Sequence, residues 1–311
     1  MDPIQSVNTK KDSTYAMMRA ASAKGWKIFY MEQKDLSLDQ GIPTAKMQEL
    51  HLLEGEENWY RLDSVIETPM AELDVLLLRK DPPVDREFIY ATYIAERAEQ
   101  EGVLVVNRPH SLRDCNEKVY ATAFPQCCPP VLISRDVKKL RAFVDEHQHV
   151  IFKPLDGMGG TSIFNVKAGD PNLGVILEVL NDFGANQVMV QRYIPEIKQG
   201  DKRILIIDGK PVDYALARIP SEGEHRGNLA AGGRGEAQPL SDRDRWIVSQ
   251  IADDLVARGL IFVGIDVIGD YLTEINVTSP TCIQEINRAY GLDIAGDLMN
   301  VIEQKLSQKQ H

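Results

Sequence analysis

The segment G-I-D-V-I-G-D-Y-L-T-E-I-N-V-T-S-P (264–280) decides the fold, and it predicts a β-hairpin. An apolar, β-branched run over 261–268 forms the first strand, and Tyr271–Val277 forms the second. Gly269 and Asp270 mark the turn, because these residue types favour tight turns between apolar runs. The hairpin therefore fixes which polar side chains share a face.

Glu274 and Asn276 are two residues apart on the second strand, so they point to the same face. The length of the turn decides whether Asp266 joins them. A two-residue turn puts Asp266 on the opposite face, whereas a three-residue turn, Gly269–Tyr271, pairs Asp266 with Glu274. We favour the three-residue turn, because it gathers two carboxylates and one amide on one face.

Asp266, Glu274 and Asn276 then form a set of oxygen donors only. Mg²⁺ prefers oxygen donors and commonly binds together with nucleotide phosphates. We therefore interpret the hairpin as a site for Mg²⁺, with Mn²⁺ as the alternative ion. The competing interpretation is a hairpin whose three polar side chains face water.

The bulk composition is that of a globular chain with an acidic surface. Its 311 residues suffice for two domains, or for one large domain with a lid. The formal charge of −11 speaks against a nucleic-acid partner, but it permits small anionic substrates. No apolar run approaches the ~18 residues of a membrane span, and the N-terminus lacks the apolar core of a signal peptide. We expect a cytoplasmic protein with no membrane partner and four reduced thiols, Cys115, Cys127, Cys128 and Cys282.

Strands and helices are predicted to alternate along the chain. The apolar run Leu73–Leu78, a helix over 86–101 and a strand over 103–107 indicate a parallel sheet covered by helices. Ser111 is expected to cap a helix that carries Lys118. The other predicted elements are helices over 13–24, 136–147, 172–183 and 242–258, strands over 26–31, 131–134, 150–154, 162–166 and 188–193, and a hairpin over 202–218.

The run K-P-L-D-G-M-G-G (153–160) is a glycine-rich turn that follows a strand. Backbone N–H groups in such turns can converge on a phosphate, because no Cβ blocks the approach. Lys153, at the strand end, is placed to reach the same anion. The run is not the Walker pattern, and the alternative interpretation is an ordinary turn.

A second glycine-rich stretch, 219–238, holds five glycines and shows no periodicity. Arginines in or before it suit carboxylates and phosphates, because a guanidinium binds two oxygens at once. A loop this long is usually functional or disordered, so we interpret it as a substrate lid rather than as surface arginines on a linker. The arginines concerned are Arg203, Arg218, Arg226 and Arg234.

Thr278-Ser279-Pro280 has the pattern of a helix start, with Ser279 as the N-cap and Pro280 at the first helical position. Free N–H groups there could bind a carboxylate of a substrate. The alternative is a cap with no ligand.

Six segments together carry a resemblance to a known family. They are R-K-D-P-P (79–83), S-L-R-D-C-N-E-K (111–118), K-P-L-D-G-M-G-G (153–160), G-D-K-R (200–203), R-G-N-L-A-A-G-G-R-G-E (226–236) and T-E-I-N-V-T-S-P-T-C (273–282). In this order they resemble the prokaryotic type of glutathione synthetase, an ATP-grasp ligase, over nearly the whole chain.

The resemblance implies that ATP phosphorylates the glycyl-facing carboxylate of γ-glutamylcysteine, and that glycine then attacks the acyl phosphate to give glutathione. Metal would bind Asp266, Glu274 and Asn276. The phosphates would bind Lys118, Lys153, Gly157, Gly159 and Gly160, adenine would bind Gln191, Tyr193 and Ile194, and ribose would bind Asp201. Arg203, Arg218 and Arg234 would stabilise the reacting groups, and Arg218, Arg226, Arg234 and Ser279 would bind the peptide substrate.

The same resemblance implies an α/β architecture: an N-terminal parallel-sheet, Rossmann-like domain (1–112), then a two-lobed α+β ATP-grasp unit (118–303, with lobes 118–190 and 191–303). It also implies a homo-oligomer with small-molecule partners. The alternatives are a ligase for another dipeptide and an ATP-binding module without catalysis. One departure stands out: family members begin with an apolar strand before the M-D-P-I segment, whereas this sequence begins at Met1. We expect that strand to belong in the middle of the N-terminal sheet, whose stability is therefore in question.

Overall fold

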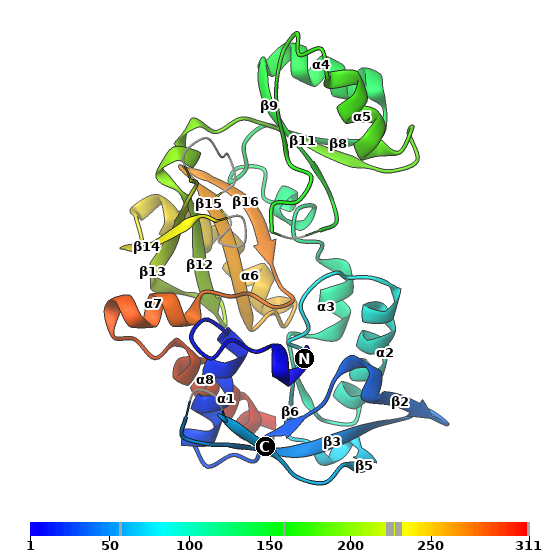
Figure 1. The fold of residues 1–311 in the computed structure, drawn as a ribbon, viewed down its shortest axis with the longest axis vertical. Helices are drawn as coiled ribbons and strands as arrows, with labels where there is room; N and C mark the ends of the chain where they lie inside the picture. Colours follow the sequence, from blue (N-terminus) through cyan, green and yellow to red (C-terminus); the bar gives the residue numbers. More distant parts are fainter. Residues whose placement is uncertain (56–57, 158, 222–226, 228–231, 310–311) are drawn as a thin grey trace.

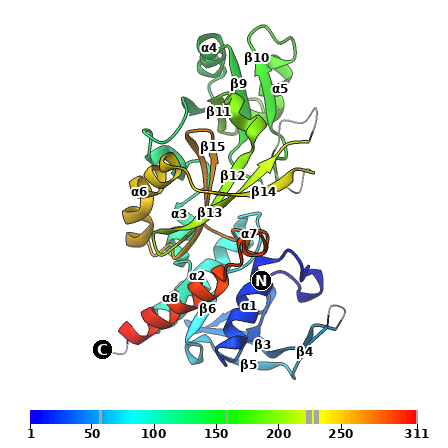
Figure 2. The ribbon, with the colours of Figure 1, turned by 90° about the vertical axis from the view of Figure 1, so that its left-hand side faces the viewer.

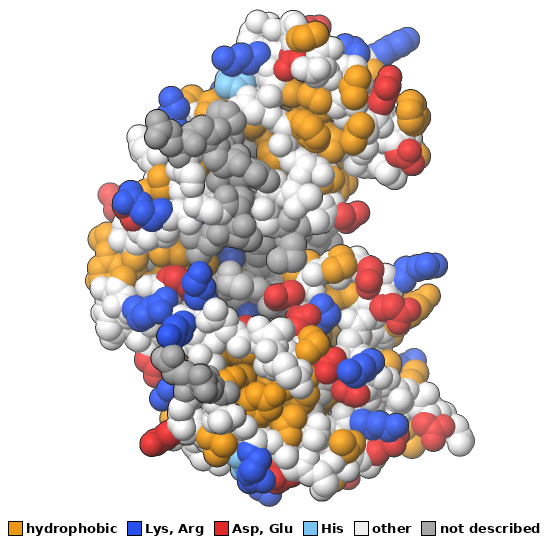
Figure 3. Space-filling model, in the orientation of Figure 1, with side chains coloured by type: hydrophobic (Ala, Val, Ile, Leu, Met, Phe, Trp, Pro, Cys, Tyr) orange, Lys and Arg blue, Asp and Glu red, His pale blue; other side chains and the backbone are white. Residues whose placement is uncertain are grey.

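The computed structural model describes residues 1–55, 58–157, 159–221, 227 and 232–309. The molecule has three tiers along its long axis (Figure 1). The lowest tier holds both termini, the middle tier a five-stranded sheet, and the upper tier a four-stranded sheet (Figures 1 and 2). The face in Figure 3 is hollowed between the upper and the lowest tier. The predicted mixed α/β class is confirmed. No helix among the described residues is long and apolar enough to cross a membrane.

The lowest tier contains an antiparallel sheet around one long strand and a separate parallel pair. Strand β6 (Val75–Leu77) pairs in parallel with β7 (Leu104–Val106), and α2 (Arg86–Gln100) connects them as predicted. The parallel pairing is confined to these two strands among the described residues, because the polar stretch before them pairs locally as hairpins. The antiparallel strands are β1 (Phe29–Tyr30), β2 (Leu36–Asp39), β3 (Ile42–Leu52), β4 (Tyr60–Leu62) and β5 (Ile66–Pro69).

The helix predicted to begin at Ser111 and to carry Lys118 is wrong in both respects. Helix α3 (Pro109–Asp114) begins two residues earlier, with proline at its first position, where the missing N–H costs nothing. The Ser111 hydroxyl instead donates a hydrogen bond to the Arg258 carbonyl oxygen at 2.6 Å. Lys118 lies in the connection after the helix, where the Asn116 side chain accepts hydrogen bonds from the N–H groups of residues 118 and 119 and forms its own turn.

The second edge of β6 faces an apolar cavity of about 710 Å³. Strand β6, Phe29 and Met299 belong to its lining, and so does Met1. Asp2 is held beside the residues that follow β6, because its carboxylate pairs with Lys80 at 2.6 Å and accepts the Asp81 N–H at 2.8 Å. Residues placed ahead of Met1 would therefore run alongside β6 in the parallel direction.

Filling this cavity is expected to stabilise the lowest tier. An extension of about seven alternating apolar residues ahead of Met1, a common strand length, should raise the melting temperature by roughly 5 °C. The strand would pair with the open edge of β6, and it would remove the buried Met1 amino group, whose pKa burial lowers. The measurement is calorimetry beside a glycine-serine extension of equal length. Equal melting temperatures for the two extensions would show that the cavity accepts no strand.

The upper tier confirms the predicted alternation of strands and helices between 131 and 193. Its antiparallel sheet has the order β10-β9-β11-β8, and two helices pack on it around Phe152, Leu140 and Leu177. The elements are β8 (Val131–Ser134), α4 (Val137–His147), β9 (His149–Pro154), β10 (Phe164–Lys167), α5 (Leu173–Asn181) and β11 (Val188–Arg192).

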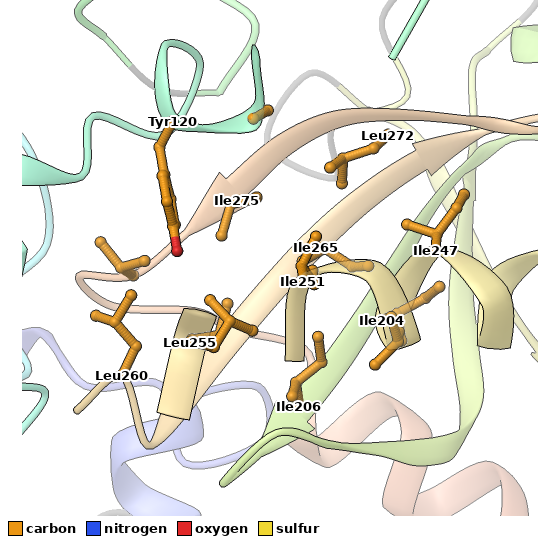
Figure 4. Packing of buried hydrophobic residues seen from close by; sticks show 14 of the residues in the cluster. Tyr120, Ile204, Ile206, Ile247, Ile251, Leu255, Leu260, Ile265, Leu272 and Ile275 are labelled. Carbon is orange, nitrogen blue, oxygen red and sulfur yellow. The ribbon is translucent and has the colours of Figure 1, made fainter. Parts of the chain in front are cut away.

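The middle tier is an antiparallel sheet in the order β14-β13-β12-β15-β16, covered on both faces. Side chains alternate along β12, so that Ile204 and Ile206 face α6 while Leu205 and Ile207 face the C-terminal helices. Figure 4 shows the first of these two cores. The elements are β12 (Asp201–Ile207), β13 (Lys210–Ile219), β14 (Arg234–Pro239), α6 (Asp242–Ala257), β15 (Phe262–Ile268), β16 (Tyr271–Asn276), α7 (Ile283–Tyr290) and α8 (Ile294–Lys309).

Three further pieces complete the chain. Helix α1 (Ser13–Ala23) packs against α8, and its N-cap Asp12 accepts the Tyr15 N–H at 2.9 Å, as the predicted helix over 13–24 requires. Short 3₁₀ turns fill the remaining connections: η1 (Ile4–Ser6), η2 (Gln33–Asp35), η3 (Met70–Glu72), η4 (Tyr120–Ala123) and η5 (Pro195–Gln199). The end of the predicted loop 219–238 is wrong, because β14 pairs there with β13 as an edge strand.

Candidate active site

The β15–β16 hairpin has a two-residue turn followed by a β-bulge. Val267 pairs with Leu272, as a two-residue turn requires, but the register then shifts and Asp266 pairs with Glu274. Thr273 is the extra residue, and its hydroxyl donates to the Asp266 carbonyl oxygen at 3.1 Å. The predicted three-residue turn is therefore wrong, whereas the predicted pairing of the two carboxylates is confirmed.

The bulge allows two apolar residues of β16 with an odd spacing to face the same core. Leu272 and Ile275 are three residues apart, yet both are fully buried in the same core with Ile265 and Val267. In a regular strand, residues three apart face opposite sides, so one of the two would point away from the core. The odd spacing of these apolar residues was the sequence signal for the bulge.

Asp266 is buried between two arginines. Its carboxylate accepts hydrogen bonds from Arg203 at 2.6 and 3.1 Å, and Arg218 approaches it to 2.9 Å. Burial alone would raise its pKa, but the two guanidinium groups hold the pKa of Asp266 well below its usual range. Gly264, across the hairpin from Asn276, leaves room for Arg203, since a Cβ there would lie 3.0 Å from the arginine Cδ.

Glu274 and Asn276 lie beside Asp266 at the surface of a cleft of about 260 Å³. The Asn276 amide donates to Asp266 at 3.3 Å. Glu274 lies 3.6 Å from the Lys153 ammonium and 3.9 Å from that of Lys118. These separations exceed hydrogen-bond length, so the Glu274 oxygens remain available to another partner.

This donor set fits a hard divalent cation. The three side chains predicted as metal ligands are adjacent, offer oxygen donors and line the cleft. Each carboxylate has about four lone-pair sites. Those of Asp266 already face Arg203, Arg218 and Asn276, so a cation would replace the long Asn276 contact, whereas Glu274 keeps its oxygens available.

Two lysines and the glycine-rich turn gather on the opposite wall. Lys118 and Lys153 are both nearly buried, and Lys118 donates to the Gly157 carbonyl oxygen at 3.3 Å. Burial opposes its charge, but the carboxylates of Glu274 and Glu117 raise the pKa of Lys118. Three glycines of the turn, Gly157, Gly159 and Gly160, have positive φ angles that other residues rarely adopt. All five residues predicted to hold phosphate therefore line one cleft.

The residues predicted for adenine and ribose line the same cleft. Gln191, Tyr193 and Ile194 follow one another at the end of β11, and the Tyr193 ring stacks on His149 with centroids 3.9 Å apart. Asp201 pairs with Arg218 at 2.6 Å, and its other oxygen has no hydrogen-bond partner among the described residues. Burial, aided by neighbouring carboxylates, raises the pKa of Asp201 to about 7. An orphaned oxygen in a cleft is suited to a ligand hydroxyl.

The remaining predicted residues fall into three groups. Ser279 lines the cleft but caps no helix, because α7 begins at Ile283 after Cys282 in a left-handed conformation, so the predicted helix start is wrong. Arg234 is exposed and pairs with Glu236 at 2.6 Å. Arg226 lies outside the described residues, as do residues 222–225 and 228–231 of the predicted lid. Gly227 is described: it is buried against Arg218, and a Cβ would lie 2.3 Å from the carbonyl oxygen of that arginine.

Sequence reasoning missed the role of Asn116 and Glu117, which precede Lys118. The Asn116 amide donates to the Leu155 carbonyl oxygen at 3.2 Å, and the Ile275 N–H donates to the Glu117 carbonyl oxygen at 2.8 Å. These contacts connect β16 to the glycine-rich turn. They join residues far apart in sequence, so no local pattern could reveal them.

The arrangement of tiers is that of known ATP-grasp enzymes. The chain superposes on the structure of ATP-grasp ligase PsnB complexed with minimal precursor, Mg, and ADP, with TM-score 0.60, 18% identity and 94% of each chain covered. It also matches the macrocyclase MdnC from Microcystis aeruginosa bound with precursor peptide MdnA, with TM-score 0.61, 16% identity and coverage of 96% and 97%. The chain therefore has the fold of the ATP-grasp enzymes.

Sequence comparisons narrow this class. The model of the prokaryotic glutathione synthetase N-terminal domain matches residues 1–113, and that of its ATP-grasp domain matches residues 117–291. Glutathione synthetase of Pseudomonas putida is 61% identical over 309 residues, 99% of this chain and 98% of that protein. The Vibrio cholerae glutathione synthetase is 56% identical over 306 residues, 98% and 96% of the two chains. The chain belongs to the prokaryotic glutathione synthetase family.

Proposed function

We propose that this protein joins glycine to γ-L-glutamyl-L-cysteine at the expense of ATP, forming glutathione, ADP and phosphate. The observation that carries the proposal is the cleft, where Asp266, Glu274 and Asn276 face Lys118 and Lys153. Full-length relatives at 55–61% identity are glutathione synthetases, which supports this substrate pair over another dipeptide.

In this proposal, one wall of the cleft binds the phosphates of ATP and the other wall binds the metal ion. The lysines and the N–H groups of 157–160 bind and orient the phosphates of ATP. Asp266, Glu274 and Asn276 would hold Mg²⁺, or Mn²⁺, which screens the phosphate charges when bound. The PsnB structure with Mg and ADP supports a divalent ion in a cleft of this fold. Gln191, Tyr193 and Ile194 receive the adenine, and Asp201 receives the ribose.

In the reaction of the peptide substrate, catalysis comes from positioning and charge stabilisation, and no side-chain nucleophile is required. Phosphorylation of the peptide carboxylate gives an acyl phosphate, and the glycine amine displaces phosphate from it. Arg203, Arg218 and Arg234 stabilise the negative charge around this carbon. The residues that bind the peptide are Arg218, Arg226, Arg234 and Ser279. Exclusion of water keeps the acyl phosphate from hydrolysis.

The wider assignment follows the same family. We propose an N-terminal domain over 1–112 and an ATP-grasp unit over 118–303, with lobes 118–190 and 191–303. The family matches to 1–113 and 117–291 support this division. We further propose a cytoplasmic homo-oligomer that acts on small molecules.

The test is ADP release with ATP, γ-glutamylcysteine and glycine together, and then with each omitted. We expect one glutathione per ADP in the full mixture, and a rate near zero without the dipeptide, because ATP has no other acceptor. Equal ADP release with an unrelated dipeptide would indicate another ligase. ATP binding without ADP release in any mixture would indicate a binding module.

A further inference from the structure

Glu117 has a fixed backbone and a carboxylate that reaches into the cleft. Its carbonyl oxygen accepts the Ile275 N–H of β16 at 2.8 Å, so its position follows the strand that carries Glu274. The neighbouring Asn116 and Lys118 contact the glycine-rich turn at Leu155 and Gly157. The Glu117 side chain is therefore held between the two walls of the cleft, of whose lining it forms part.

The carboxylate of Glu117 accepts a hydrogen bond from the Lys118 ammonium, which is also the group proposed to bind the nucleotide phosphates. Glu117 Oε1 is the hydrogen-bond acceptor nearest to Lys118 Nζ, and Gly157 O accepts a second bond at 3.3 Å. Glu274 stands 3.9 Å from the same ammonium. A lysine has only three donors, so an arriving phosphate must displace Glu117 or share Lys118 with it.

The charges around this point balance. The largely buried charged side chains in the described part of the cleft are the cations Lys118, Lys153, Arg203 and Arg218 and the carboxylates Glu117, Asp201, Asp266 and Glu274. A metal-free nucleotide brings only negative charge into this set, whereas a metal-bound nucleotide brings its own compensation. Removal of the Glu117 charge would leave an excess of positive charge beside the phosphates.

We propose that Glu117 is a positioning residue that competes with nucleotide phosphates for Lys118 and so makes the cleft select metal-bound over metal-free nucleotide. The proposal rests on the function proposed above and names a specificity determinant within it. A metal-free nucleotide has to compete with Glu117 for Lys118, and its phosphates are repelled by the Glu117 carboxylate. With a cation beside Glu274, the same carboxylate is attracted to the incoming complex, and the competition is relieved.

The test is calorimetric titration of ADP into the full-length protein, once in EDTA and once in Mg²⁺. We expect Glu117→Gln to bind metal-free ADP about tenfold more tightly than the wild type, while binding in Mg²⁺ changes little or weakens. Glu117→Asp keeps the charge and should stay near the wild-type ratio of the two dissociation constants. Asp156→Asn, which removes an exposed carboxylate from the same cleft, should also leave that ratio unchanged.

The two conditions separate selection from damage. Weaker binding of Glu117→Gln by the same factor in EDTA and Mg²⁺ would mean that Glu117 only supports the fold, and an unchanged ratio would also overturn the proposal. An equal shift in Asp156→Asn would mean that overall charge, rather than competition for Lys118, sets the preference. Failure of the proposed function is seen elsewhere, in the substrate-omission assay, because ADP binding involves neither glycine nor dipeptide.

Discussion

Glu274→Gln is expected to lower the turnover number by about a hundredfold at limiting Mg²⁺, with the melting temperature nearly unchanged. The substitution removes one of two adjacent carboxylates from the set that would hold the metal. Charge screening of the transferring phosphoryl group weakens accordingly. Within the described part of the chain, the Glu274 carboxylate makes only long ion-pair contacts, 3.6 and 3.9 Å, to the two lysines, so little folding energy depends on it.

The measurement is steady-state turnover across a Mg²⁺ titration, beside differential scanning calorimetry. Glu236→Gln is the matched control, because Glu236 lies on the same sheet but is exposed on edge strand β14. The Glu274 variant should need more Mg²⁺ for half-activation, whereas the control should not. Near wild-type turnover of Glu274→Gln at limiting Mg²⁺ would mean that the hairpin is not the metal site.

Arg218→Met is expected to destabilise the protein by about 3–5 kcal/mol, a large share of the stability of a typical domain. The arginine pairs with Asp201 at 2.6 Å and with Asp266 at 2.9 Å, and its side chain is only 5% exposed. Its loss leaves two buried carboxylates with one fewer compensating charge. The melting temperature should fall by roughly 10 °C.

Part of this loss should depend on pH. Burial already raises the pKa of Asp201 to about 7, and removing Arg218 raises it further above its unfolded value. Without Arg218, the ionised form of Asp201 destabilises the folded state. The contribution of Asp201 to the loss of folding stability therefore grows as pH rises above 7 and shrinks as pH falls below it. Melting curves at pH 6 and pH 8.5 measure the difference.

A second substitution tests the cause. Arg218→Met combined with Asp201→Asn should recover part of the lost stability, because the amide needs no counter-charge. A double variant no more stable than Arg218→Met would show that packing, and not the uncompensated carboxylate, explains the loss.

The sequence was most informative where local patterns are strong. The β15–β16 hairpin, the helix over 86–101 and the hairpin over 202–218 follow from apolar periodicity and turn residues, and they form as predicted except for the turn length and bulge of the first. Ser111 and Ser279 misled, because each has the pattern of an N-cap but is used otherwise. Ser111 donates across the fold to Arg258, and Ser279 lies in a loop that lines the cleft.

The site itself could be predicted only as a set of residues. Asp266, Glu274 and the two lysines were identifiable, but the partners that fix their charges come from distant segments. Arg203 and Arg218, predicted to act on the substrate, line the cleft, and both also pair with the buried carboxylates of Asp266 and Asp201. Such pairings depend on how sheet strands order themselves, which no spacing along the chain encodes.

The bulge at Thr273 has a consequence for how this strand can change. Side chains alternate along a strand, so one extra residue would, like a shift of reading frame, reverse the face to which every later side chain points. The bulge absorbs this shift, because Thr273 is the extra residue, and so Glu274 and Asn276 stay beside Asp266 while Ile275 stays in the apolar core. Deletion of Thr273 would leave Leu272 and Ile275 two residues apart, and a regular strand would keep all of these side chains on their present faces. Loss of Thr273 should therefore be better tolerated than the insertion of one residue between Glu274 and Ile275, which would turn Ile275 out of the apolar core.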